Sequence, residues 1–199
     1  MYMVLLLCIL IFGEPIPMEK LFDIFAKSYA LSPEKDPEFF SYVGYLYCTD
    51  EVQSMRQYPQ HSTCNRLDHI RAVTYMSYIL SKKFGCNVKA ASRGAILHDL
   101  VYYDWHDPDW SHRPHGFRHP KFAAANARLL CPDLTKKEER IILRHMWPLT
   151  ILPPSSREGI IVTFSDKYCA SKEMKLSKDE KKKKEFEKKL RQINSSMNK

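Results

Sequence analysis

Apolar side chains recur every three or four residues along most of the chain, which is the spacing of amphipathic helices. This pattern predicts helices over residues 18–31, 37–47 and 65–84, and a short helix from residue 50 to about residue 58. The segment 65–84 gives the clearest signal, because one apolar stripe runs along it and a glycine follows it. The stripe consists of Ile70, Val73, Met76 and Leu80, and Gly85 stands where a helix is expected to end.

The middle of the chain contains a buried helix and a long irregular segment. Residues 88–101 are apolar on almost every side, which predicts the central buried helix of the fold. Residues 102–118 are rich in Pro, His, Asp and Trp and show no period. We expect them to form a loop, and a segment of this length is often functional. A helix with a small-residue face is predicted over residues 119–130.

Two capping boxes mark the starts of later helices. Thr135 is followed three residues later by Glu138, and Ser155 is followed by Glu158. The first box predicts a helix that ends near Pro148, since the residue before a proline disfavours helical backbone. The second box predicts a helix over residues 159–170.

These elements predict an all-α protein, a single-domain bundle of about six to nine helices. The length of 199 residues, an apolar fraction of 44% and an aromatic fraction of 12% support a folded chain with a sizeable core. We expect an apolar N-terminal extension over residues 1–17, N-terminal helices over 18–64, a domain core over 65–170 and a basic C-terminal tail or helix over 171–199.

The amino terminus and the cysteines bear on the cellular compartment. Residues 1–12 are nearly all apolar, but a helix of this length does not cross about 30 Å of hydrocarbon. We therefore expect an extension before a fold that starts near Met18, with a membrane anchor as the alternative. The six cysteines are scattered without a CxxC pair, which indicates reduced and mostly buried thiols in a cytoplasmic protein.

The net charge of +8 is concentrated at the C-terminus. Residues 171–199 hold 11 Lys/Arg and 5 Asp/Glu, whereas residues 1–170 hold 20 and 18. The body is nearly balanced, which argues against a nucleic-acid-binding face on it. The basic tail is expected to be a solvated helix, with binding to RNA or to an anionic membrane surface as the alternatives.

Six polar residues stand in segments where the pattern expects core, and together they suggest a metal site. A buried imidazole or carboxylate is costly unless it is paired or bound to a cation. Taken singly, each is better explained as a hydrogen-bonded core residue, so the hypothesis depends on the whole set. Nitrogen and oxygen ligands of this kind suit Fe, Mn or Zn. The set consists of His69, His98, Asp99, His119, His145 and Asp166.

The same residues stand in short motifs that resemble the HD superfamily of metal-dependent phosphohydrolases. The motifs are Asp68-His69-Ile70-Arg71-Ala72-Val73, Arg93-Gly94-Ala95-Ile96-Leu97-His98-Asp99, Arg144-His145 and Ser165-Asp166-Lys167-Tyr168. The resemblance covers about half of the chain, and it implies the helical HD domain as the fold. Among the members, it is strongest to bacterial two-metal HD hydrolases that split dinucleoside polyphosphates.

The resemblance also implies a set of ligands. A single ion in this superfamily is held by residues that correspond to His69, His98, Asp99 and Asp166. Members with two ions add two histidines, here His119 and His145, and Asp99 would then bridge the ions. The cofactor implied is a divalent metal, two ions of Fe or Mn, with Zn, Co, Ni or Mg as alternatives.

The implied reaction is attack of a metal-activated hydroxide on phosphorus. Candidate cations for the phosphoryl charge are the four that adjoin the expected ligands in the sequence, Arg118, Lys121, Arg144 and Lys167. His61 and His115 are candidate proton donors to the leaving group, since histidine titrates near neutral pH. For all six, ordinary surface positions are the alternative.

One departure from the superfamily concerns the substrate side. Many members follow the His-Asp pair with a lysine that lies near phosphate, whereas this chain continues Leu100-Val101-Tyr102-Tyr103-Asp104-Trp105-His106. The sequence thus predicts a hydrolase acting on a nucleotide or another small phosphate ester or anhydride, with a different substrate wall. The alternatives are a non-catalytic nucleotide-binding or sensor module and a di-iron oxygenase on the same fold.

Overall fold

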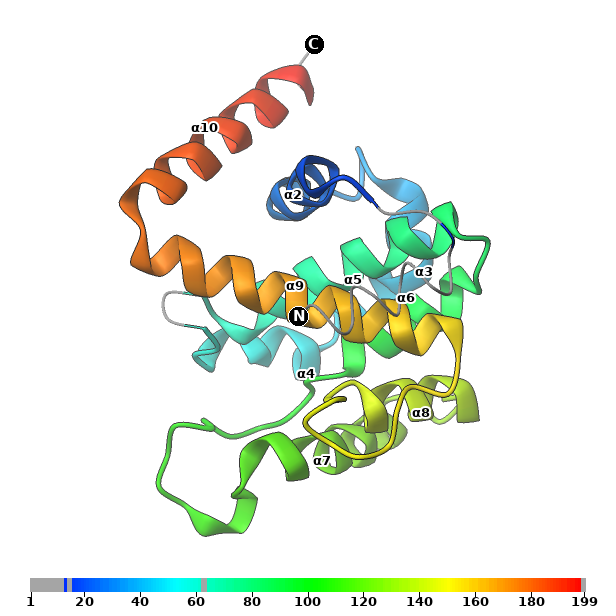
Figure 1. The fold of residues 1–199 in the computed structure, drawn as a ribbon. Helices are drawn as coiled ribbons and strands as arrows, with labels where there is room; N and C mark the ends of the chain where they lie inside the picture. The colour runs from blue at the N-terminus through cyan, green and yellow to red at the C-terminus, as the bar shows by residue number, and fades with distance from the viewer. Residues whose placement is uncertain (1–12, 14–15, 62–63, 198–199) are drawn as a thin grey trace.

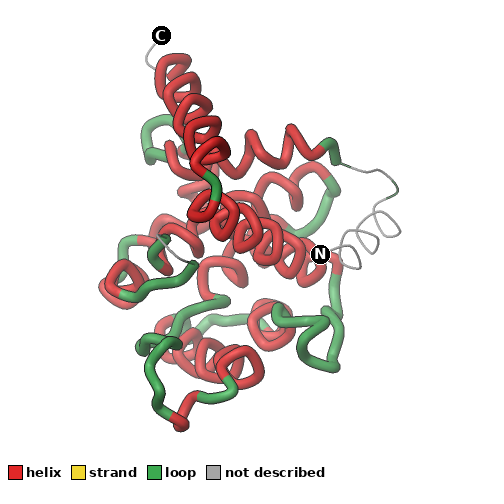
Figure 2. The backbone as a smooth tube through the Cα atoms, turned by 60° about the vertical axis from the view of Figure 1, so that its left-hand side comes forward, coloured by secondary structure: helices red, strands yellow, loops and turns green. Residues whose placement is uncertain are grey.

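A computed structural model describes residues 13, 16–61 and 64–197 of the chain. Within these residues the chain forms nine α-helices and three short 3-10 helices, with no strand beyond an isolated bridge between Pro59 and Asn65. The all-α prediction is therefore confirmed, and Figure 2 shows helices joined by loops throughout the described chain. No helix of this part is long and apolar enough to cross a membrane.

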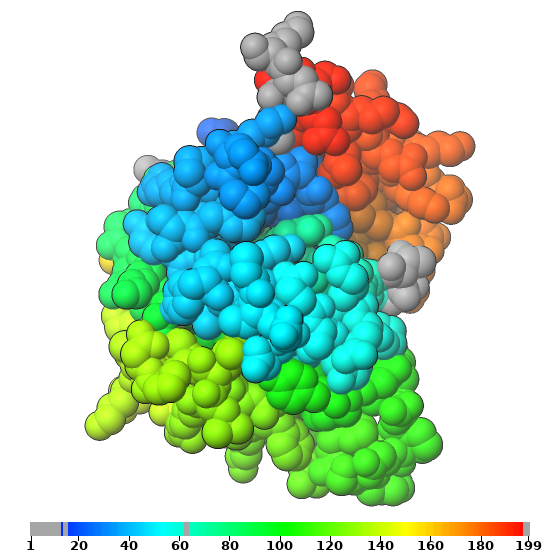
Figure 3. Space-filling model, turned by 180° about the vertical axis from the view of Figure 1, so that it is seen from behind, coloured from blue at the N-terminus to red at the C-terminus, as the bar shows by residue number. Residues whose placement is uncertain are grey.

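The N-terminal helices follow the predicted segments closely. They are α2 (Met18–Lys27), α3 (Pro37–Tyr47) and α4 (Asp50–Gln53), and α2 and α4 continue as 3-10 turns over Ser28–Ala30 and Ser54–Gln57. Most of the predicted extension 1–17 lies outside the described residues. Seen from behind, the blue and cyan surface of these N-terminal elements covers the upper left and the centre of the molecule, beside the red and orange surface of the C-terminal part (Figure 3).

The centre of the molecule is formed by α5 (Arg66–Lys83) and α6 (Val88–Leu97), which lie against each other. Each begins at an asparagine whose side chain accepts a backbone N–H, Asn65 for α5 and Asn87 for α6. α5 also contacts α9, so the central position predicted for residues 88–101 is shared by both helices. α6 ends at Leu97, four residues before the predicted end.

The segment after α6 runs out of the bundle and returns as α7 (His115–Leu130), with a 3-10 turn over Trp110–His112 (Figure 1). The predicted helix start at residue 119 was wrong by one turn. The first turn of α7 belongs to the segment 102–118, which shows no hydrophobic period and was therefore expected to be a loop. Pro120 lies inside the helix, where it removes one intrahelical hydrogen bond.

The last two core helices are α8 (Lys136–Arg144) and α9 (Arg157–Lys178). The capping box of Thr135 and Glu138 is confirmed, with both reciprocal bonds present. The second predicted box is wrong, because Ser156 caps α9 and Glu158 instead accepts the backbone N–H of Asn87. α9 also runs eight residues beyond the predicted end at residue 170, and of these added residues only Glu173 is buried.

The basic tail forms α10 (Glu180–Met197), and it is not fully solvated as predicted. In Figure 1 it rises from the end of α9 beside α2. Phe186 lies among Phe22, Phe25 and Tyr29, with ring centroids 5.2–6.4 Å apart. This aromatic cluster attaches the apolar side of α10 to the body, and Lys189 adds an ion pair with Asp23 of α2, while the other described lysines of α10 are exposed.

The thiols were expected to be mostly buried. The five described cysteines are free, but only Cys131 and Cys169 are buried. Cys64 and Cys86 are half-buried, and Cys48 is exposed. The prediction of burial is therefore wrong for three of them, which lie in connecting segments just after α3, just before α5 and between α5 and α6.

Candidate metal centre

Five helices bring the six predicted ligands to one point inside the bundle. His69 lies in the first turn of α5 and Asp166 in the middle of α9. His98 and Asp99 directly follow α6, His119 lies in α7 and His145 directly follows α8. All six residues are buried, with exposed fractions between 0% and 7%.

The carboxylate of Asp99 occupies the middle of this cluster. Its Oδ1 atom lies 3.1 Å from Nε2 of His119 and 3.7 Å from Nε2 of His145. Its Oδ2 atom lies 3.6 Å from Nε2 of His98 and 4.0 Å from Nε2 of His69. One oxygen therefore faces each pair of histidines, which is the arrangement expected of a bridging ligand.

Asp166 completes the His69 side of the cluster. Its Oδ1 atom lies 3.2 Å from Nε2 of His69 and 4.0 Å from Nε2 of His98. Its other oxygen accepts a hydrogen bond of 2.7 Å from the Lys167 ammonium group. Two imidazoles and two carboxylates thus meet on this side, while two imidazoles and one carboxylate meet on the other.

The outer ring nitrogens fix how the four imidazoles face. Nδ1 of His98, His119 and His145 lies 2.6–3.0 Å from a backbone carbonyl three or four residues earlier. Because a carbonyl only accepts, each Nδ1 carries the proton and donates. In the neutral imidazole, Nε2 then presents a lone pair to the centre of the cluster, as a metal ligand does.

Two further observations show that this donor set fits a cation. The buried Nε2 atom of His98 has no hydrogen-bond partner among the described residues. Nε2 of His119 and Nε2 of His145 lie 2.9 Å apart, although with protonated Nδ1 atoms both present lone pairs. Lone pairs that face each other in a buried site repel unless a cation attracts both. Nitrogen and carboxylate oxygen together suit Fe, Mn or Zn.

The electrostatic surroundings keep most of these groups in the metal-binding form. Burial lowers the pKa of His98, and burial together with His119 and His98 lowers that of His145 well below its usual value. Burial alone would raise the pKa of Asp99, but His98 and His119 hold it well below its usual range. Neutral imidazoles and ionised carboxylates are the species that bind metal ions.

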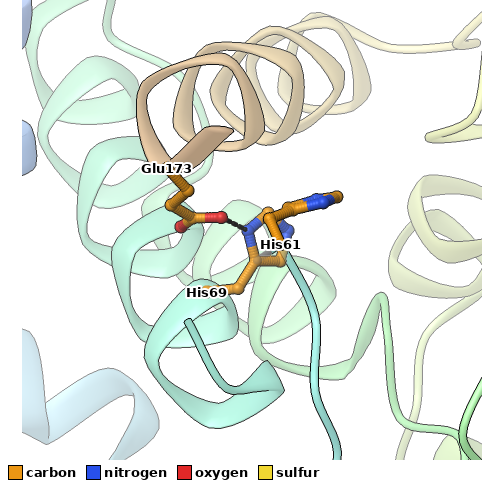
Figure 4. Close-up of side chains that lie close together, drawn as sticks. All are labelled: His61, His69 and Glu173. Atoms are coloured by element: carbon orange, nitrogen blue, oxygen red, sulfur yellow. Dashed lines mark hydrogen bonds and ion pairs between the residues drawn. The ribbon is translucent and has the colours of Figure 1, made fainter. Parts of the chain in front are cut away.

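His69 differs from the other histidines because its outer nitrogen faces a carboxylate. Nδ1 of His69 lies 2.9 Å from Oε2 of Glu173, which reaches it from α9 (Figure 4). Burial works to lower the pKa of His69, but Glu173 and Asp166 raise it well above its usual value. Glu173 was missed from the sequence, since the predicted helix ended at residue 170. Its position seven residues after Asp166, two turns along the same helix face, was the available signal.

A cavity of about 370 Å³ opens onto the cluster. Of the six residues proposed as cations or proton donors, three line this cavity: His61, His115 and Lys167. The ring of His115 stacks with that of His119, with centroids 4.4 Å apart, and with that of Trp105, with centroids 5.6 Å apart. Trp105 also lines the cavity, and it belongs to the aromatic segment that follows the His-Asp pair.

Three cations proposed from their neighbours in the sequence do not reach this cavity. Arg118 is exposed and lies over the ring of Phe122. Lys121 and Arg144 instead line a separate groove of about 700 Å³ between α7 and α8. Each stands within two residues of a candidate ligand in the sequence, and neighbours along a helix point in different directions. We therefore do not assign them to the site.

The family comparison agrees with this arrangement. The HD domain family matches residues 66–171, which contain all six residues of the cluster. No curated protein and no solved structure matches the chain significantly. A match over 106 of 199 residues, together with the buried histidine and aspartate cluster, leads to one conclusion: the chain belongs to the HD domain family.

Proposed function

We propose that this protein is a metal-dependent phosphohydrolase that cleaves an ester or anhydride bond in a nucleotide or another small phosphorylated molecule. The observation that carries the proposal is the convergence of four Nε2 atoms on the two oxygens of Asp99. A cluster of this kind at the bottom of an open cavity is suited to bind an ion and a substrate together.

The residues divide into two ligand groups that share Asp99. His69, His98, Asp99 and Asp166 would hold one ion, and His119, His145 and Asp99 would hold the other. Iron or manganese is our first choice for these nitrogen and oxygen donors, and Zn, Co, Ni or Mg are the alternatives to test. When bound, such ions supply Lewis acidity, which lowers the pKa of water towards neutrality and offsets negative charge on phosphoryl oxygens.

Lys167 is the residue best placed to attract a phosphate group. Its Nζ atom lies 2.7 Å from Oδ2 of Asp166 and 3.4 Å from the carbonyl oxygen of His145, on the wall of the cavity. These contacts hold the ammonium group beside both ligand groups. A fixed positive charge at this position stabilises negative charge that develops on a phosphoryl oxygen.

His115 and His61 are better suited to bind a substrate through hydrogen bonds as neutral rings than to donate a proton as imidazolium ions. Burial and the neighbouring His119 lower the pKa of His115 to about 3. Burial, followed by the neighbouring His69, lowers the pKa of His61. Both rings are therefore neutral at pH 7. A neutral ring still donates through one nitrogen, and Tyr103 OH lies 3.2 Å from Nδ1 of His115.

The lining of the cavity is suited to bind a small phosphate ester that carries one flat ring. The volume of about 370 Å³ lies in the range of small-molecule sites. Among the described lining residues Lys167 is the only lysine or arginine, so a long polyphosphate would find few charges to match. Trp105 and His115 stack nearly parallel, at 22°, and offer an aromatic wall to a base or a similar ring.

Hydrolysis of a panel of phosphate esters and anhydrides tests this proposal. Protein reconstituted with Mn²⁺ or Fe²⁺ would be given a nucleoside monophosphate, p-nitrophenyl phosphate and a dinucleoside tetraphosphate. Inorganic phosphate would be measured for the first two substrates and nucleotide products for the third, with oxygen consumption recorded in parallel. We expect metal-dependent hydrolysis that Asp166→Asn lowers by at least about 100-fold. Oxygen uptake without hydrolysis, or nucleotide binding without turnover, would contradict it in favour of the oxygenase or the sensor.

A further inference from the structure

The carboxylate of Asp99 has one partner outside the histidines, and this partner was not predicted. Nε2 of Gln60 donates a hydrogen bond of 2.7 Å to Oδ2 of Asp99. Gln60 is buried and lies on the wall of the cavity, six residues before the family match begins. We propose that Gln60 is a positioning residue that fixes the rotation of the Asp99 carboxylate, so that each oxygen faces a different pair of histidines and would be available to a different ion.

Arg66 determines which end of the Gln60 amide faces Asp99. Its Nε atom donates to Oε1 of Gln60 at 2.9 Å. Because a guanidinium only donates, the amide oxygen must face Arg66 and the amide nitrogen must face the carboxylate. A flipped amide would place its oxygen against Asp99 and its nitrogen against Arg66, which would cost both hydrogen bonds.

Arg66 also holds the chain that carries Asp99. Its Nη1 atom donates to the carbonyl oxygens of Val101 at 2.6 Å and Tyr103 at 3.1 Å, directly after the His-Asp pair. The same guanidinium therefore fixes the Gln60 side chain and the backbone beyond Asp99. This shared anchor leaves the carboxylate little freedom to turn.

The backbone around Gln60 is fastened as well. The N–H of Gln60 donates to the carbonyl of Cys64, and the N–H of Arg66 donates to the carbonyl of Tyr58, both at 2.9 Å. These bonds tie residues 58–60 to the start of α5, the helix that carries His69. The position of Gln60 is thus set by the same helix terminus that supplies a ligand.

The hydrogen bond from Gln60 determines how the Asp99 carboxylate is shared between the two pairs of histidines. Gln60 presents N–H to the site and so does not act as a ligand, but it occupies one lone-pair direction of Oδ2. With this bond in place, Oδ1 is turned to His119 and His145, and Oδ2 to His98 and His69. Without it, the carboxylate would be free to turn both oxygens to the ion of His69, His98 and Asp166, and the ion of His119 and His145 would then lose its only carboxylate ligand. The inference rests on the proposed two-ion site.

Metal binding by Gln60→Met and Gln60→Asn tests the inference. Both side chains lose the contact, Met by chemistry and Asn by length, so Asn serves if Met does not fold. Gln53→Met is the matched control, since Gln53 donates to the carbonyl of Tyr47 away from the cluster. Mn²⁺ affinity would be measured by chelator competition, and the bridged pair by the exchange-coupled Mn²⁺ signal in electron paramagnetic resonance.

We expect the second Mn²⁺ to bind 10–100-fold more weakly in the Gln60 variants, with loss of the coupled signal, and no change in Gln53→Met. Wild-type affinity and a retained coupled signal in both Gln60 variants would overturn the inference and leave the two-ion site standing. A wild-type protein that binds no more than one Mn²⁺ would instead overturn the two-ion site on which the inference rests.

Discussion

Glu173 lies against the ring of His69, with 2.9 Å between Oε2 and Nδ1, although the two residues are 104 positions apart in the chain. The other three histidines of the cluster donate to backbone carbonyls instead. A charged acceptor forms a stronger hydrogen bond than a neutral one and makes the opposite ring nitrogen a better ligand. His69 is therefore set apart from the other three.

Replacing Glu173 should weaken metal binding without removing a ligand. Glu173→Gln keeps an oxygen that accepts from Nδ1 of His69 but lacks the negative charge. We expect affinity for Mn²⁺ to fall by about 10–100-fold in chelator competition. Glu158→Gln is the control, since Glu158 is a buried carboxylate of the same helix that faces Asn87 instead. Equal affinities in Glu173→Gln and wild type would show that the contact is purely structural.

Replacing Lys167 should lower catalytic activity, whereas replacing Lys121 should leave it nearly unchanged. Lys167→Met removes the only Lys or Arg charge among the described residues of the cavity wall, and Lys121→Met removes a charge from the separate groove. We expect kcat/KM to fall by about 100-fold or more in the first and to stay within about twofold in the second. Metal content must be measured in both, because Lys167 also contacts Asp166. A comparable loss in both variants would count against the assignment.

Phe186 should contribute to the stability of the whole protein. Its ring lies among Phe22, Phe25 and Tyr29, so Phe186→Ala exposes apolar surface on α2 and α10. For this half-buried ring we expect the free energy of unfolding to fall by about 1–3 kcal/mol in urea titrations. Lys184→Ala, on the exposed face of α10, should change it by less than about 0.5 kcal/mol. An unaltered unfolding midpoint for Phe186→Ala would show that α10 is not attached through this cluster.

The close approach of α6 and α8 depends on Gly94. A Cβ atom at this position would lie 2.8 Å from Cγ2 of Ile141, so Gly94→Ala forces the helices apart. We expect a loss of about 1–3 kcal/mol in unfolding free energy. The same substitution in an Ile141→Ala background should cost less, because the obstructing methyl group is gone. Strictly additive losses in the double variant would argue that the two residues do not meet.

Most of the helices could be predicted from the sequence, because their caps and apolar stripes are local signals. Asn65, Thr135 and Gly85 mark real boundaries in the structure. One error arose where a distant contact decides the outcome. Glu158 accepts the backbone N–H of Asn87 and does not cap the start of its own helix. Local patterns carry no information on such partners.

The candidate site divides in the same way. The six candidate ligands could be named from the sequence because a polar residue in an apolar segment is visible there and the family motifs connect them, and the structure places all six in one buried cluster. Their supporting residues were missed, since Gln60 and Glu173 acquire a role only through the residues they meet in space. Three cations were proposed for the site only because they stand near candidate ligands in the sequence. Their side chains leave the helix in other directions and do not line the cavity, as found for Arg118, Lys121 and Arg144.

The most direct test of this account is elemental analysis of wild-type protein and Asp99→Ala after reconstitution with Fe²⁺ or Mn²⁺ and removal of loose ions. Circular dichroism would first establish that both are helical. We predict two tightly held ions per chain in the wild type and none in Asp99→Ala, because both ligand groups share this carboxylate. A wild type that retains no ions, or an Asp99→Ala protein with the full wild-type content, would contradict the proposed metal centre.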